Sequence, residues 1–443
     1  MHVSAFLYAA AERGELPWKV LFEIERRHLA ARCPDCRPGV EAFLEGRASE
    51  AARDSAPSLD PLEGVRRRRG LTRRQLQHEA KVARKWLRTL VQKVPQGKRS
   101  AKVNGAYKHY RGSVFGVLLL EEARKAIRQD AAESLSLAEA TLASCRVTHP
   151  DDPDPHVWIP ALAVRGNALR ALGRLRQAEE TLEEAVELLD SSELDDIAVA
   201  AELDSYLGSL RKDQLRLGEA SRHLERAGLF YSLLNDGANA AATFDLLGIV
   251  HHRAHELDAA VDAVRKALEL LGPSVEGRQA AYARYNLAVY LHARGDTAEA
   301  EAELQDHADL LAGAGEMVAA HVTWLRARIA WSRGKLAAAD RLFREALAWA
   351  RSRKLHFDAG LLSLERALVH LARGRTDRVR KLAKEALALF AREEEVERET
   401  RAALEVLEAA ARRDALTRKA LEKAVATLDG ARHRRPAGDS PGE

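Results

Sequence analysis

The stretch that decides the fold is ALRALGRLRQAEETLEEAVEL at residues 168–188, because its spacing of small and apolar residues returns further along the chain. Two later stretches repeat that spacing, YLHARGDTAEAEAEL at 290–304 and IAWSRGKLAAADRLFREAL at 329–347. In all three, a glycine separates two runs of strong helix formers and an alanine follows five residues later. A repeated helical unit is therefore the first feature that the sequence predicts.

Small residues set the register of this repeat along the middle of the chain. They stand at intervals of 42, 40, 40, 39 and 40 residues, at Gly166, Gly208, Gly248, Ala288, Ala327 and Ala367. Twelve residues after each comes another small position, at Ala178, Ala220, Ala260, Ala300, Ala339 and Val379. Seven residues further on, every copy has alanine except one, which has His307. Small side chains let two helix axes approach closely, so each unit is predicted to be an antiparallel helix pair that stacks on the next.

The quoted stretches resemble tetratricopeptide repeats, and the resemblance covers roughly residues 157–390, with irregular units at 113–147 and 396–428. It implies an all-α fold, a right-handed superhelical solenoid of about six to eight helix hairpins behind a small helical N-terminal region. The period of about 40 residues exceeds the 34 of that family's standard unit. Longer hairpins of this kind resemble the repeats of bacterial regulators that sense peptides or partner proteins.

Composition divides the chain into five parts. We interpret residues 1–48 as an N-terminal helical segment, 49–64 as a linker rich in Ser, Pro and Asp, and 65–112 as a basic helical segment. The repeat solenoid follows at 113–428, and 429–443 read as a disordered tail.

The basic segment concentrates the positive charge of the protein. Between Val65 and Arg111 there are sixteen Lys and Arg and one acid, Glu79, which gives +15. Since the whole chain carries a formal charge of +4, the remainder carries −11. Apolar residues at spacings of three and four predict an amphipathic helix over 71–94, with Thr72 as its N-cap.

A patch of ten cations is the candidate interaction surface of that segment. It consists of Arg66, Arg67, Arg68, Arg69, Arg73, Arg74, Lys81, Arg84, Lys85 and Arg88. Such groups neutralise phosphates and release counterions, and the nearby rings of Tyr107 and Tyr110 suit base stacking. Three interpretations stay open: nucleic acid, an acidic surface on a partner or on the repeats themselves, and a solvated helix face without a ligand.

A dithiol motif lies in the N-terminal segment, HLAARCPDC at residues 28–36. Two thiolates two residues apart suit one tetrahedral zinc. The motif resembles the zinc-binding helix of bacterial anti-sigma factors, and on that likeness His28, Cys33 and Cys36 are the ligands. Four residues separate His28 from Cys33, one more than in that family, and a fourth ligand is not evident. The alternative is a reduced, metal-free dithiol at a helix end.

The sequence carries no catalytic motif of the phosphate-loop, zinc-protease or nucleophile-elbow kind. We therefore expect a non-enzymatic protein. Three cysteines exclude a disulfide framework. No apolar run approaches the roughly 20 residues of a membrane span. We therefore expect a cytoplasmic location.

The resemblance also implies a binding groove, because in this repeat family the first helix of each pair lines the concave side. Transferring the register gives the groove candidates Lys212, Asp245, His252, Tyr282, Tyr285, His292, His321, Trp324, Arg328 and Trp331. Tyr, Trp and Arg dominate binding hot spots, so these residues favour an extended peptide or a partner helix as the ligand. For Trp324 and Trp331, packing between repeats is the alternative. Equivalent positions of the last unit hold Leu361, Leu364, Leu368 and Leu371, which favours packing there.

These observations predict a scaffold or regulatory adaptor that binds a protein or peptide in its groove. Two other functions stay open: a nucleic-acid-binding or transcription-associated regulator acting through the basic segment, and a structural subunit of a larger assembly. Fold alone does not decide among them.

Overall fold

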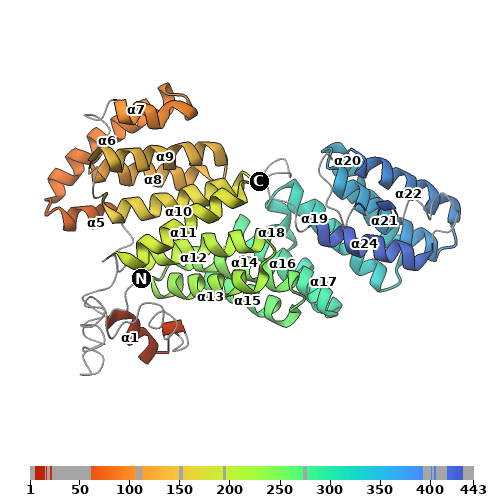
Figure 1. Ribbon diagram of the computed structural model, residues 1–443. Coiled ribbons are helices and arrows are strands. Elements are labelled where there is room, and N and C mark those ends of the chain that lie inside the picture. Colours follow the sequence, from red (N-terminus) through yellow and green to blue (C-terminus); the bar gives the residue numbers. More distant parts are fainter. Residues whose placement is uncertain are drawn as a thin grey trace. The chain divides into compact units, whose positions relative to one another are not determined.

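The fold is known from a computed structural model. It describes residues 5–14, 16, 20–21, 61–105, 112–148, 153–192, 196–272, 277–392, 401, 404–405 and 417–432. The regular structure of these residues is helical, without a strand (Figure 1). The predicted all-α helical-repeat fold is therefore confirmed. Within the same residues, no helix combines the length and apolar character needed to cross a membrane.

The described chain divides into two compact units, one ending at Thr243 and the other beginning at Phe244. The helices of the first unit are α1 (Ala5–Glu12), α5 (Pro61–Arg68), α6 (Arg73–Lys93), the 3-10 turn η1 (Gln96–Lys98), α7 (Arg99–Gly105), α8 (Ser113–Ala126), α9 (Ala131–Thr148), α10 (Pro155–Ala171), α11 (Leu175–Ser191), α12 (Ile197–Asp213) and α13 (Leu217–Leu233). Helix α14 (Gly237–Arg253) contains the boundary.

The second unit continues the alternation of helices. It comprises the rest of α14, then α15 (Leu257–Leu271), α16 (Arg278–Arg294), α17 (Thr297–Asp306), α18 (Ala308–Gly313), α19 (Glu316–Ser332), α20 (Leu336–Ser352), α21 (His356–Ala372), α22 (Thr376–Phe390) and α24 (Arg418–Arg432). In both units consecutive helices pack as pairs, such as α12 with α13 and α21 with α22.

Glycines mark the closest approach of the two helices in a pair, as the repeat register predicts. A Cβ on Gly166 would lie 2.6 Å from Leu182 Cγ, and one on Gly248 would lie 2.6 Å from Val264 Cγ2. At distances this short, a methyl group on either glycine would force the neighbouring side chain to move. The alanines twelve residues later are fully buried, as at Ala178 and Ala260.

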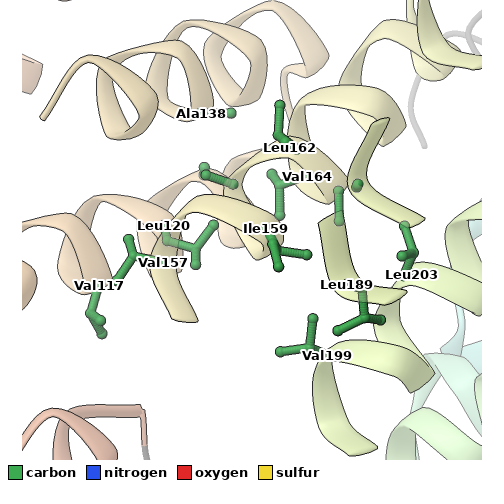
Figure 2. Packing of buried hydrophobic residues seen from close by; sticks show 14 of the residues in the cluster. Val117, Leu120, Ala138, Val157, Ile159, Leu162, Val164, Leu189, Val199 and Leu203 are labelled. Atoms are coloured by element: carbon green, nitrogen blue, oxygen red, sulfur yellow. The ribbon is translucent and has the colours of Figure 1, made fainter. Parts of the chain in front are cut away.

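Layers of branched aliphatic side chains fill the core of the first unit. Figure 2 shows Val117 and Leu120 of α8 beside Val157 of α10, and Ile159 of α10 above Leu189 and Val199. Each pair thus buries the apolar face that it cannot bury alone, which is the physical basis of a repeat fold.

The helix pair of α16 departs from the regular pattern, because its second helix is interrupted at His307. This residue stands where the other copies have alanine, and it separates α17 from α18. Its ring is half-buried and Nδ1 lies 3.1 Å from the carbonyl oxygen of Glu303. A side chain larger than alanine at a close-packing position explains why the helix does not continue.

The amphipathic helix expected at 71–94 is α6, and its N-terminus is capped as predicted. Thr72 Oγ1 accepts from the backbone N–H of Gln75, and the side chain of Gln75 accepts from the backbone N–H of Thr72. Ala80, Ala83, Leu87 and Leu90 form its buried stripe, which packs on α8.

Two expected boundaries differ from the structure. Helix α5 begins at Pro61, inside the expected linker, and an ion pair of 2.5 Å between Glu63 and Arg66 stabilises its turn. Helix α24 ends at Arg432, inside the expected tail. Both segments are polar in composition, but local ion pairs and burial against other helices stabilise them as helices.

Candidate partner-binding surface

Helices α14 and α16 present two pairs of polar and aromatic side chains to each other. Asn286 Nδ2 donates to Asp245 Oδ1 at 3.0 Å, and burial raises the pKa of Asp245 to about 6. Two turns further along α14 and one turn further along α16, the rings of His252 and Tyr290 stack with their centres 4.8 Å apart. Burial lowers the pKa of His252, so the imidazole favours its neutral form.

An aromatic row continues from α16 to α19. The ring of Tyr285 lies 5.9 Å from that of His321, nearly parallel to it. His321 in turn contacts two indoles, Trp324 at 6.5 Å and Trp349 of α20 at 6.3 Å. Tyr285 and His321 are both half-buried.

A charged cluster joins α19, α21 and α24. Arg328 lies 2.7 Å from Glu365 Oε1 and 2.8 Å from Asp429 Oδ1, and its guanidinium stands 5.2 Å from the centre of the Trp324 ring. Burial opposes the charge on Arg328, but the two carboxylates outweigh it and raise its pKa, so the guanidinium stays charged.

The structure places Trp324 in the interior rather than on an open wall. Its side chain is 4% exposed and its Nε1 donates to Glu365. The packing alternative that the sequence leaves open therefore describes Trp324. Trp331 is half-buried and packs on the same apolar cluster.

The remaining groove candidates fall in two places. Tyr282 and His292 are half-buried on α16; burial lowers the pKa of His292, and the positive charge of Arg328 lowers it further. Lys212 belongs to the first unit, where its Nζ lies 3.0 Å from Asp213.

We call the half-buried and buried set on the first helices of the second unit the first-helix face. It comprises Asp245, His252, Tyr285, Asn286, Tyr290, His292, His321, Trp324, Arg328 and Glu365. The sequence analysis missed Asn286, Tyr290 and Glu365. A signal for Glu365 exists, since it is the acid within the apolar run LLSLERALVH at residues 361–370.

The arginine run of the basic patch is engaged with acids. Arg66 and Arg67 lie 2.5 and 3.7 Å from Glu63. Arg69 lies 2.7 Å from Glu79, and Arg68 lies 4.0 Å from Asp154 at the start of α10. Arg66 and Arg67 therefore pair within α5, whereas Arg68 and Arg69 link the end of that segment to α10 and α6.

The other six cations of the patch are exposed along α6. They are Arg73, Arg74, Lys81, Arg84, Lys85 and Arg88. At about 100° per residue, these positions fall within about a third of the helix circumference, away from the buried stripe. Among the described residues, none of the six has a carboxylate within ion-pair distance, and Lys85 lies 5.8 Å from the ring of Trp86.

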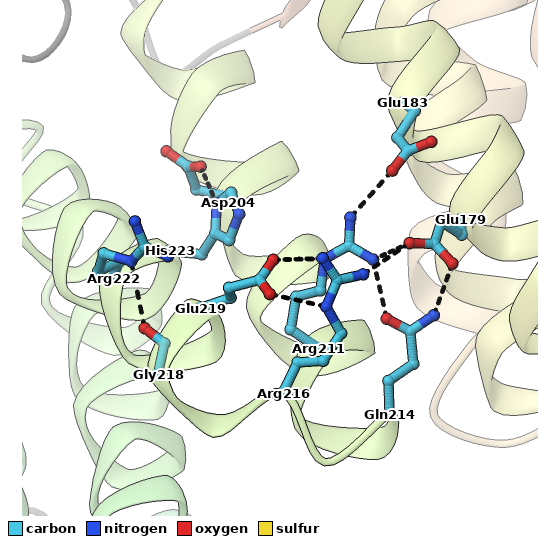
Figure 3. A network of polar contacts seen from close by, with 10 residues as sticks. All are labelled: Glu179, Glu183, Asp204, Arg211, Gln214, Arg216, Gly218, Glu219, Arg222 and His223. Carbon is cyan, nitrogen blue, oxygen red and sulfur yellow. Dashed lines mark hydrogen bonds and ion pairs between the residues drawn. The ribbon is translucent and has the colours of Figure 1, made fainter.

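A charge network around the buried Arg211 joins three helices of the first unit. Figure 3 shows Arg211 of α12 between Glu179 and Glu183 of α11 and Glu219 of α13. Gln214 and Arg216 extend it. Three acids around one buried guanidinium satisfy its charge and fix the three helices relative to one another.

Two adjoining hollows in the first unit are lined by residues of α7, α9, α10 and α11, none of which is among the groove candidates. Their volumes are about 430 and 300 Å³, and they share Glu139, Arg165 and Glu184. Trp158 lines the smaller one, with the guanidinium of Arg146 5.0 Å from its ring centre.

The expected zinc ligands His28, Cys33 and Cys36 lie outside the described residues, as do Tyr107 and Tyr110. Within the described part, no three His, Cys, Asp or Glu side chains gather as metal ligands would. Cys145 is 6% exposed, and burial raises the pKa of its thiol to about 12.

Comparisons with known proteins agree with this architecture. The model of the tetratricopeptide repeat family matches residues 159–188, which lie in α10 and α11. No curated protein matches the sequence. A solved structure of a Rap protein complexed with Competence and Sporulation Factor is similar in fold, with a TM-score of 0.54 at 13% identity over 72% of this chain and 87% of that one.

Two further solved structures align at lower TM-scores. BtubC from P. vanneervenii has a TM-score of 0.30 and 15% identity over 64% of this chain and 92% of its own. The Cut9–Hcn1 hetero-tetramer of the APC/C has 0.32 and 14% over 92% of this chain and 89% of that chain.

Proposed function

We propose that this tetratricopeptide-like helical-repeat protein is a non-enzymatic, cytoplasmic scaffold or regulatory adaptor that binds a protein or peptide partner. The observation that supports it is the first-helix face, which brings aromatic, imidazole, amide and guanidinium groups from four first helices together. Such groups bury a large area at modest entropic cost and keep a polar handle for orientation.

The half-buried part of this face, on α16, is the contact region of the proposal. Tyr285 and His292 are half-buried there, beside the half-buried Tyr282 of the same helix, and His292 Nδ1 lies 3.3 Å from Thr297 Oγ1. Asn286 offers an amide, although its Nδ2 is already bonded to Asp245. A row of rings with interspersed hydrogen-bonding groups suits an extended peptide, whose backbone and side chains alternate along its length.

Site-specific photocrosslinking tests the proposal. A benzophenone amino acid placed at Tyr285 or at His292 is expected to capture a defined partner, because both positions line the contact region. Arg344, exposed on the second helix α20, is the matched control position. Capture at Arg344 without capture at Tyr285 or His292 contradicts the proposal and favours a structural subunit that docks through another surface.

A second function, nucleic-acid binding, is favoured by the six exposed cations of α6. Their placement on one side of a helix suits a row of phosphates, and each phosphate contact contributes to the salt dependence of binding. The acidic partner protein remains the competing ligand for the same charges.

A salt series with a DNA duplex as the probe tests this second function. Replacing Lys81, Lys85 and Arg88 by Gln is expected to flatten the dependence of the logarithm of the binding constant on the logarithm of salt by roughly 3, about 1 per phosphate contact. Lys266→Gln, an exposed change on α15, serves as the control. An unchanged slope contradicts a nucleic-acid role for α6.

Zinc binding by His28, Cys33 and Cys36 stays a proposal from the sequence. Zinc analysis of the purified protein beside the double variant Cys33→Ser, Cys36→Ser tests it, since equal zinc content in both excludes the dithiol as a site.

A further inference from the structure

Helix α24 packs on a first helix of the repeats. It buries Leu421 and Leu428 completely and Ala424 almost completely, at spacings of three and four residues. These side chains belong to the apolar cluster that contains α21, and α21 is the helix that α24 packs against most. Its opposite side is exposed and charged, with Arg418, Glu422 and Lys423.

The repeat register assigns one side of α21 to the groove, and the leucines of that side belong to the same apolar cluster as Leu421 and Leu428 of α24. Leu361, Leu364 and Leu368 stand 40 residues after His321, Trp324 and Arg328. In α21 these leucines are 0, 0 and 7% exposed. Helices α20 and α22 also pack on α21, so α24 completes the cover of a helix that is buried nearly all round.

The end of α24 reaches past α21 to α19. Asp429, directly after Leu428, lies 2.8 Å from Arg328 of α19. Glu365 of α21 already lies 2.7 Å from the same guanidinium. Without Asp429, Arg328 would still pair with Glu365. Its guanidinium could then also donate hydrogen bonds to an acid of another helix.

We propose that α19 and α21 form a docking surface for an amphipathic helix, that α24 is its resident occupant, and that a partner binds by displacing α24. The partner is a helix with two leucines seven residues apart, a small residue between them, and an acid directly after the second leucine. The inference deepens the proposed function, because it names the partner chemistry and the regulation of the α19–α21 part of the first-helix face. The partner cannot bind while α24 is docked. Its apparent binding constant is therefore the intrinsic binding constant multiplied by the fraction of molecules in which α24 is undocked.

The test uses the full chain and a fluorescent peptide of residues 417–432 as the probe. Asp429→Lys places a cation against Arg328 and is expected to release α24, which raises the affinity for the probe at least tenfold over the wild-type chain. Glu422→Gln, on the exposed side of the same helix, is the matched control and should bind as the wild type does. Asp429→Asn is the milder variant if the lysine disturbs folding, with circular dichroism as the check.

A charge reversal separates docking from general stickiness. In the Asp429→Lys background, Arg328→Glu is expected to abolish the gain, because the introduced lysine and glutamate attract each other and α24 docks again. Equal probe affinity in wild type and Asp429→Lys overturns the proposal, as does a gain that persists with Arg328→Glu. A wild-type dimer whose dissociation by Asp429→Lys is seen in light scattering also overturns it, because α24 then docks on a second copy.

Failure here is distinguishable from failure of the proposed function. The crosslinking positions Tyr285 and His292 lie on α16, whereas α24 packs on α21 and pairs with α19. Partner capture at α16 therefore stands or falls independently of the release of α24.

Discussion

Glycines at the contact between paired helices are the residues on which the repeat depends most directly. A Cβ on Gly208 would lie 2.6 Å from Leu224 Cγ, whereas a Cβ on Gly218 at the exposed start of α13 would meet no atom within 4 Å. Glycine is thus required at Gly208 and not at Gly218, the second residue of α13, and the distance to the neighbouring atoms makes the difference.

Gly208→Ala is expected to lower the free energy of unfolding by about 1–3 kcal/mol, because Leu224 must leave its position to admit the methyl group. Gly218→Ala is the control and is expected to raise it by up to about 1 kcal/mol, since alanine has the higher helix propensity. Urea denaturation followed by circular dichroism measures both. Equal effects of the two substitutions would contradict the close-approach explanation.

Asp245 makes stability depend on pH in a direction that can be worked out. Burial raises its pKa to about 6 in the folded chain, whereas an unfolded aspartate has a pKa of about 4. Between these values the folded state holds a proton that the unfolded state has lost. The stability from this group is therefore greatest at the acidic end and is lost as the pH rises through about 6.

Asp245→Asn is expected to remove this dependence. Between pH 4 and pH 7, the free energy of unfolding of the variant should rise relative to that of the wild type by on the order of 2 kcal/mol. The size of this rise follows from the separation of the two pKa values. Denaturation at both pH values checks it, with the exposed Asp262→Asn as control. A difference between variant and wild type that is the same at both pH values would contradict the assignment.

At the scale of the helical element, the connection within each hairpin from α10–α11 to α21–α22 contains one residue in the left-handed region. Gly173, Gly334 and Gly374 have φ of 73°, 69° and 69° there, but α12 and α13 are joined through Leu215 at φ 60°. A branched residue is strained in this conformation. Leu215 is also 52% exposed, so its side chain contributes little packing in return.

Leu215→Gly is expected to stabilise the protein by about 1 kcal/mol, because glycine adopts positive φ without the steric cost. Thermal unfolding measures the change. Gly374→Leu, the reverse substitution at an equivalent turn, should lower the melting temperature, and a stabilising effect of that change would sink the explanation.

The helices also differ in how well the sequence predicts their ends. Helix α6 agrees with its expected range and cap because both depend on residues within one turn, Thr72 and Gln75. The break between α17 and α18 was not foreseen, although His307 already stood out from the alanines of the other copies. Whether a larger side chain at a packing position is absorbed or interrupts the helix depends on its neighbours in space.

At the scale of the whole molecule, stability is expected to be distributed over two units, since each has its own set of buried side chains. In a repeat fold the energetics are a sum of local and nearest-neighbour contributions. Damage to one core should therefore remain largely within its unit.

Phe343→Ala tests this distribution. The ring is 1% exposed in α20, so its removal should cost about 3–5 kcal/mol. Hydrogen exchange followed by mass spectrometry is expected to show lost protection in α19–α22 and unchanged protection in α8 and α9. Phe230→Ala, fully buried in α13 of the first unit, is the counterpart and should give the inverse pattern. Equal loss in both units after either change would disprove independent cores.

The sequence by itself determined the helix pairs, their turns, and the small residues between them, because those contacts join residues that are near in the chain. It also gave the cations of α6 as a row, since helical periodicity alone sets their direction. Only the tertiary structure decided that Trp324 is buried, that Glu365 accepts its hydrogen bond, and that Arg328 meets Asp429, 101 residues away. Contacts between residues so far apart in the sequence depend on where α24 packs on the repeats, and the repeat period does not predict that position.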